Sequence, residues 1–137
     1  MFKRKRLPPE LVPAYDAFLA VLAQVEAGKL MLAGVMPTTR LPGRPMPDAL
    51  FEFEERALRA TELMPAWRLP ALEAEWSDCE QGLAEARERA RRFREEGPEL
   101  GGFEGLIWAV EQLIAPLEPF EAAALRFRAL RTSPKSP

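Results

Sequence analysis

Two arginines in a short proline-rich segment, residues 36–47, are the side chains best suited to bind a charged group. Arg40 and Arg44 flank a Leu-Pro-Gly turn, and Thr38 and Thr39 precede them. A guanidinium donates two parallel hydrogen bonds to a carboxylate or phosphate, and threonine hydroxyls are further donors. Loops of this length without secondary structure are often functional. The segment is therefore either a partner- or anion-binding loop, or a connector whose arginines pair with acidic side chains of the same chain.

The two ends of the chain offer a different chemistry, the binding of nucleic acid. Each end carries four basic residues and no acidic one, whereas the residues between them are acidic overall. Phosphate contacts would come from the N-terminal cluster and from two arginines of a later helix: Lys3, Arg4, Lys5, Arg6, Arg91 and Arg94. Such binding is weak and sensitive to salt, and neither interleaved aromatic residues nor a nucleic-acid motif adds specificity. The simpler interpretation is a solvated arm and a solvated helix face.

Several classes of catalytic chemistry are excluded by the residue types. The sequence contains no histidine, which removes Ser–His and Cys–His nucleophiles and histidine-bearing zinc sites. Cys79 is the only cysteine and falls at helical spacing between Trp76 and Leu83, so we expect an inert core thiol. No glycine-rich phosphate loop occurs. We therefore expect a non-catalytic protein that holds no metal or other cofactor.

Residues 72–93 form the clearest structural element. Their apolar positions step by four and three residues without a miss, which is one face of a helix: Leu72, Trp76, Cys79, Leu83, Ala86, Ala90 and Phe93. Acidic residues gather near the start and arginines near the end, as the helix dipole favours. The pattern predicts a helix that continues to Glu96 and buries this seam.

Four further segments show helical spacing between prolines. We expect the first from about Pro13 to Val35 and the second from an N-cap at Asp48 to Leu63, with a buried face at Leu50, Phe51, Phe53, Ala57 and Leu58. A fourth helix follows the glycines at 101–102, and its wide apolar face is typical of a buried helix: Phe103, Leu106, Ile107, Val110, Leu113 and Ile114. Pro116 and Pro119 break it, and a last helix runs to about Arg131.

These patterns predict an all-α, single-domain protein. Helices joined by short connections indicate an up-and-down bundle of four to five helices over residues 1–137, with residues 36–47 as its one Pro-rich loop. The basic arm, residues 1–7, and the tail, residues 132–137, are expected to be disordered. Trp67 lies in a connector between two prolines, where it either closes the end of the bundle or contributes to a binding surface.

The location of the protein is inferred from what the sequence lacks. No apolar run approaches the ~20 residues that span a bilayer, and the basic N-terminal residues are followed by Leu7-Pro8-Pro9 rather than by the apolar core of a signal peptide. A single cysteine fits a reducing compartment. We expect no membrane span and a cytoplasmic location.

The preferred function is protein–protein interaction. We predict a non-catalytic adaptor or regulatory module that contacts an unidentified protein partner through the Pro-rich loop and Trp67. Self-association through the third helix is one form of this prediction, because Ala86 and Ala90 allow close packing. The alternatives are a nucleic-acid-associated accessory protein and, with less support, a small-molecule-binding bundle with an aromatic interior.

Overall fold

The computed structural model describes residues 5–38, 40–97 and 102–132 of the chain. Within these ranges the chain forms five α-helices: α1 (Val12–Ala33), α2 (Met46–Leu63), α3 (Glu73–Glu96), α4 (Gly102–Ile114) and α5 (Pro119–Ala129). Short 3-10 turns accompany them: η1 (Pro9–Leu11), η2 (Met64–Trp67), η3 (Pro70–Leu72) and η4 (Ala115–Leu117). The prediction of an all-α, single-domain bundle is confirmed.

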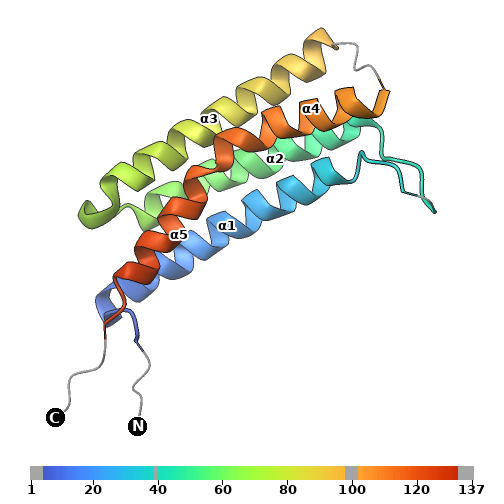
Figure 1. Ribbon diagram of the computed structural model, residues 1–137. Coiled ribbons are helices and arrows are strands. Elements are labelled where there is room, and N and C mark those ends of the chain that lie inside the picture. Colours follow the sequence, from blue (N-terminus) through green and yellow to red (C-terminus); the bar gives the residue numbers. More distant parts are fainter. Residues whose placement is uncertain (1–4, 39, 98–101, 133–137) are drawn as a thin grey trace, which may run out of the picture.

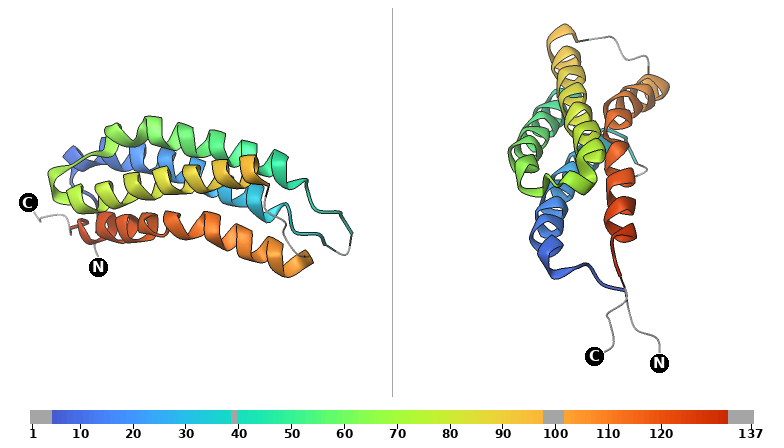
Figure 2. Two further views of the ribbon diagram at one scale, coloured as in Figure 1. Left: turned by 90° about the horizontal axis from the view of Figure 1, so that it is seen from above. Right: turned by 90° about the vertical axis from the view of Figure 1, so that its left-hand side faces the viewer.

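The helices form an up-and-down bundle with four sides (Figure 1). α1, α2 and α3 alternate in direction, and α4 and α5 together run back along α3 as the fourth side. η4 separates α4 from α5, because Pro116 and Pro119 interrupt the helix as predicted. The start of α1 and the end of α5 lie at one end of the bundle, and the loop between α1 and α2 lies at the other (Figure 2).

Aromatic side chains fill the end of the core that lies near the termini. Phe18 of α1 packs against Trp67 and Phe127, with ring centroids 5.0 Å apart in each case, and Phe120 lies beside it. Edge-on and tilted aromatic pairs of this kind add about 0.5–1.5 kcal/mol each to the effect of burial. The cluster joins η2 and α5, which are distant in sequence, to the first half of α1.

The seam of α3 is buried as predicted. Cys79, Leu83, Ala86 and Ala90 are all inaccessible to solvent or nearly so, and only Phe93 at the far end is partly exposed. Because Ala86 and Ala90 are covered by the chain's own helices, the prediction of a homodimer through these two alanines is wrong. α3 ends at Glu96 and is capped by Gly97, which has a left-handed backbone (φ 53°) and donates its N–H to the carbonyl of Phe93 at 3.1 Å.

α2 differs from the prediction at its start and in its outward face. It begins at Met46, and Asp48 lies inside the first turn, where its charge suits the helix dipole but its side chain forms no cap. Phe51 and Leu58 were expected in the core, yet they are 56% and 41% exposed. Phe53 lies on the buried side of α2 instead. Phe51 is two residues before Phe53 and Leu58 is five residues after it, and side chains at these spacings on a helix point away from the core.

α4 is far less buried than its wide apolar face predicted. Ala109 and Leu113 are its only fully buried side chains among those described, whereas Phe103 and Trp108 are 57% and 51% exposed. Figure 2 shows why: the first part of α4 leans away from the other helices, so that they cover only one strip of it. An apolar surface that the sequence assigns to the core therefore faces solvent.

The chain ends are only partly as expected. Residues 1–4 and 133–137, which belong to the arm and tail predicted to be disordered, lie outside the described residues. Arg6 and Thr132 instead form an antiparallel bridge through two backbone hydrogen bonds of 2.8 and 2.7 Å. Leu7 packs against the core, so the inner part of the arm is held in place. Among the described helices, none has the length and apolar character needed to cross a membrane.

Replacing Gly82 with alanine should destabilise the bundle. An alanine Cβ at this position of α3 would lie 2.1 Å from the carbonyl oxygen of Pro116, which belongs to the η4 backbone. Glycine-to-alanine changes inside helices usually stabilise by about 1 kcal/mol, and here we expect the opposite sign, a loss of roughly 2 kcal/mol. Thermal unfolding should show a Tm lower by roughly 5 °C.

The matched control is Ala84→Gly, on the exposed side of the same helix. It should cost about 1 kcal/mol through helix propensity alone. A Gly82→Ala variant with an unchanged or higher Tm would show that η4 does not approach α3 this closely.

Candidate interaction surfaces

The Pro-rich loop holds one of its two arginines against the bundle. Arg44 donates hydrogen bonds of 2.8 and 3.0 Å to the two carboxylate oxygens of Glu52 on α2. The same hydrogen bonding lowers the pKa of the Glu52 carboxyl below its usual value. The fork of Arg44 is therefore already occupied by a carboxylate of its own chain, as the connector interpretation requires.

The threonine of the loop stabilises the turn itself. Thr38 Oγ1 accepts hydrogen bonds from the backbone N–H groups of Leu41 (3.0 Å) and Arg40 (3.3 Å), a common turn-forming arrangement. Arg40 is exposed, and Thr39 lies outside the described residues. The predicted anion site is thus not assembled. Arg44 and Thr38 form hydrogen bonds within the chain that stabilise the loop, and neither is positioned to bind an anion together with Arg40.

Trp67 is buried rather than available to a partner. Its side chain is fully inaccessible, its indole N–H points to the sulfur of Met64 at 3.2 Å, and its ring packs on Phe18. The prediction that Trp67 contributes a contact surface is therefore wrong. The alternative interpretation, in which this tryptophan closes the end of the bundle, describes its position.

The predicted nucleic-acid residues do not form one basic surface. Lys3 and Arg4 lie outside the described residues. Lys5 and Arg6 are exposed, and Arg6 is bridged to Thr132. Arg91 and Arg94 lie on α3, in a groove that α3 forms with α2. We call this the charged groove; its volume is about 450 Å³ and its lining residues are Phe51, Glu54, Glu55, Leu58, Ala84, Arg87, Glu88, Arg91 and Arg94.

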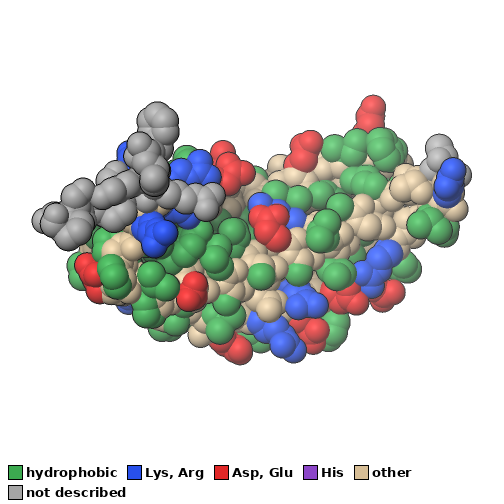
Figure 3. Space-filling model, turned by 90° about the horizontal axis from the view of Figure 1, so that it is seen from below, with side chains coloured by type: hydrophobic (Ala, Val, Ile, Leu, Met, Phe, Trp, Pro, Cys, Tyr) green, Lys and Arg blue, Asp and Glu red, His purple; other side chains and the backbone are tan. Residues whose placement is uncertain are grey.

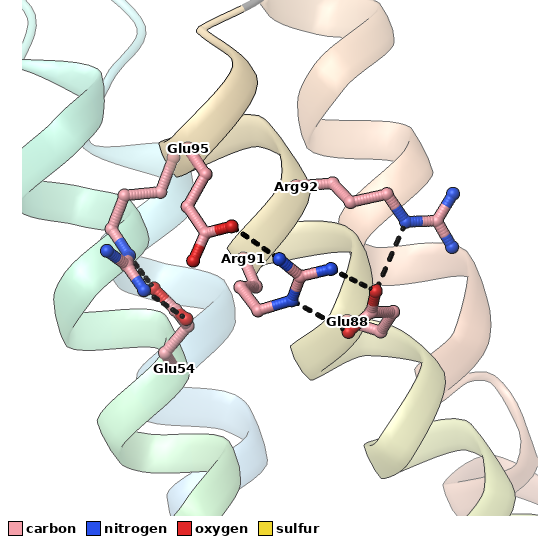
Figure 4. A network of polar contacts seen from close by, with 6 residues as sticks. Glu54, Glu88, Arg91, Arg92 and Glu95 are labelled. Carbon is pink, nitrogen blue, oxygen red and sulfur yellow. Dashed lines mark hydrogen bonds and ion pairs between the residues drawn. The ribbon is translucent and has the colours of Figure 1, made fainter.

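Two of the three arginines of the charged groove, Arg91 and Arg94, are paired with carboxylates, and Figure 4 shows the contacts of Arg91. Arg94 bridges the two helices through a 2.6 Å contact between its Nε and Glu54. Arg91 lies between Glu88, at 2.9 Å from its Nε, and Glu95. The hydrogen bond from Arg91 lowers the pKa of the Glu88 carboxyl. Guanidinium groups neutralised in this way have little charge left for phosphates.

Phe51 and Leu58 supply the apolar part of the charged groove, and sequence reasoning missed them by assigning them to the core. Their seven-residue spacing was a usable signal. A stripe through Leu50, Phe53 and Ala57 already fills one face of α2, so a second apolar line on the same helix must face elsewhere.

A second surface, which we call the apolar face, begins on α1. Val12, Leu19 and Leu30 share one side of this helix, and Leu19 and Leu30 are 41% and 71% exposed. α1 carries three charged residues in 22 positions. Two of these, Glu26 and Lys29, pair with each other at 3.4 Å, so the surface around them has little unbalanced charge.

α4 supplies the other half of the apolar face. Trp108 packs on Phe93 of α3, and Arg89 of α3 bonds to the Gln112 carbonyl at 2.7 Å, which fixes the side of α4 that faces α3. Phe103, Ile107, Val110 and Ile114 step by four and three residues along the opposite side, toward α1. Figure 3 shows hydrophobic side chains spread along this face of the molecule, with some charged side chains between them.

Comparison of the chain with protein-family models, curated proteins and solved structures gave no match.

Cys79 should resist thiol reagents in the folded protein. Its side chain is fully buried in the α3 seam, and burial raises the pKa of the thiol to about 12. At about pH 8 the thiolate fraction is then on the order of 10⁻⁴, and the reagent has no path to it. The rate of reaction with a chromogenic disulfide should be at least about a hundredfold lower in buffer than in guanidinium chloride. Equal rates would mean that the seam opens readily.

Proposed function

We propose that the protein is a non-catalytic interaction module of the cytoplasm, an adaptor or regulatory protein that binds an apolar helix of a protein partner through the apolar face. One observation carries the proposal: Leu19 and Leu30 on α1 and Phe103 on the neighbouring α4 are exposed, and these two helices carry few charged residues. Exposed apolar surface shared by two elements is a common mark of an interaction site.

The arrangement of the apolar face suits a helical partner. α1 and α4 present rows of apolar side chains at helical spacing, and a helix with anchors at every third or fourth position can lie along such rows. Fully burying one leucine or phenylalanine contributes roughly 1.5–3 kcal/mol. Several anchors are needed to offset the cost of association, and the two helices together provide them.

The other predicted functions have less support. Arg91 and Arg94 are paired with carboxylates, which argues against a phosphate-binding surface on α3. Inside the core, the cavity beside Gly28 has a volume of about 10 Å³, too small for the ligand of an aromatic interior.

A double substitution on α1 tests the proposal. Leu19→Glu with Leu30→Glu places two charges on the apolar face without touching the core, since both side chains are exposed. Proteins captured from host extract by the tagged wild-type chain would be identified, and the affinity of the purified partner measured. We expect the double variant to bind at least about a hundredfold more weakly, because two apolar anchors become charged groups that must be desolvated.

The matched control is Leu63→Glu, on α2, where the leucine is 38% exposed but belongs to neither named surface. It should bind the partner as the wild type does. If the double variant retains full affinity while its circular dichroism is unchanged, the apolar face is not the binding surface and the proposal fails.

A further inference from the structure

The two walls of the charged groove carry opposite charge. The α2 wall is acidic, with Glu54 and Glu55. The α3 wall is basic, with three arginines against one glutamate: Arg87, Arg91, Arg94 and Glu88. Apolar side chains lie between them, at Phe51, Leu58 and Ala84. Arg91 and Arg94 are paired with carboxylates of the same chain, so the opposite charges available to a second copy are those of Glu55 on the α2 wall and Arg87 on the α3 wall. A surface with one acidic edge, one basic edge and an apolar centre is complementary to a copy of itself.

Symmetry decides how two such surfaces can meet. A twofold axis parallel to the helices sets the acidic α2 wall of each copy on the basic α3 wall of the other. A twofold axis across the helices would set acidic wall on acidic wall, which like charges disfavour. Rotation about the parallel axis leaves each residue at its own level along the bundle. Because Glu55 and Arg87 line the same groove from opposite walls, as do Leu58 and Ala84, this rotation brings Glu55 of one copy towards Arg87 of the second and Leu58 towards the second copy's Ala84.

We infer that the charged groove binds a second copy of this chain, in a twofold dimer in which α2 of each copy packs against α3 of the other. This inference is independent of the apolar face, which lies on α1 and α4. It differs from the dimer expected through Ala86 and Ala90, because those side chains are buried inside each copy.

The side chains needed for pairing between copies are available. Glu55 and Arg87 make no hydrogen bond or ion pair with other described residues, whereas Arg94 is held by Glu54 at 2.6 Å within its own chain. Phe51 and Leu58 are exposed in the single chain and would be covered in the dimer. The dimer thus satisfies two charges and removes two large apolar groups from water.

The size of the surface sets the expected strength. An 18-residue helix is about 27 Å long, and two packed helices are about 20 Å wide, so the projected footprint is on the order of 500 Å² per copy. Stable pairs bury about 800 Å² per partner. We therefore expect a reversible dimer with a micromolar dissociation constant that weakens as salt increases.

Charge exchange between the two walls tests this inference in the full chain. Sedimentation velocity over a series of micromolar concentrations would be measured for the wild type, Glu55→Arg, Arg87→Glu and the double variant. The twofold dimer contains two contacts between position 55 of one copy and position 87 of the other. Each single substitution places like charges at both contacts, so the Kd should rise at least about tenfold. The double variant restores opposite charges between copies, so its Kd should return to within about threefold of the wild-type value.

The control reversal is Glu111→Arg on α4, outside the charged groove, which should leave the Kd unchanged. A wild-type chain that sediments as a monomer at every concentration would overturn the inference while leaving the apolar-face proposal untouched. A dimer whose Kd is the same in the wild type and in the two single charge-reversal variants would also overturn it. If Leu19→Glu with Leu30→Glu dissolves that dimer, the apolar face is the self-association surface instead.

Discussion

Burial of the α3 seam is the constraint on which the rest of the structure depends. α3 contacts α2, α4, η4 and α5, and the small side chains on its seam determine how closely each can approach. Gly82 lies against the backbone of Pro116, and Trp76 donates its indole N–H to the carbonyl of Met64 at 2.8 Å. These two contacts join the middle of α3 to η4 and its start to η2. Both positions tolerate little change, because backbone atoms are the partners.

The contact at Gly82 determines where the fourth side of the bundle is divided into α4 and α5. Once η4 is held on α3, α5 is directed into the aromatic end of the core, where Phe120 and Phe127 are buried beside Phe18. α4 has weaker attachments to α3, through Trp108 and Gln112. α5 is therefore part of the core, whereas α4 leans outward and exposes its apolar residues to solvent. The apolar face is a consequence of how the chain crosses α3.

The two surfaces of the bundle differ in the physics by which they would bind. The apolar face has few unpaired charges, and its affinity for a partner would come from water released from leucine and phenylalanine side chains. The charged groove combines Phe51 and Leu58 with walls of opposite sign, so its binding would depend on salt and on orientation. Because the two surfaces lie on different helices, α1 and α4 against α2 and α3, binding at one of them would leave the other accessible.

The sequence by itself determined the helical class, the breaks at Pro116 and Pro119, and the buried seam through Trp76 and Leu83. These follow from local properties: the 3.6-residue period, the missing proline N–H and the burial of regularly spaced apolar residues. It also indicated a buried Cys79, since that thiol shares the seam.

Tertiary structure alone decided which of several apolar lines on a helix is covered. α2 carries two lines of apolar side chains and α4 carries a broad one. Helical periodicity cannot show which line is buried, because burial depends on where the neighbouring helices lie. Trp67 shows the same limit, since a tryptophan between prolines is compatible with a surface and with a closed core. Arg44 is held by Glu52, a partner in the next helix, and only the path of the loop brings the two together. Local pattern therefore determined the elements, and the packing of those elements decided which residues meet the solvent.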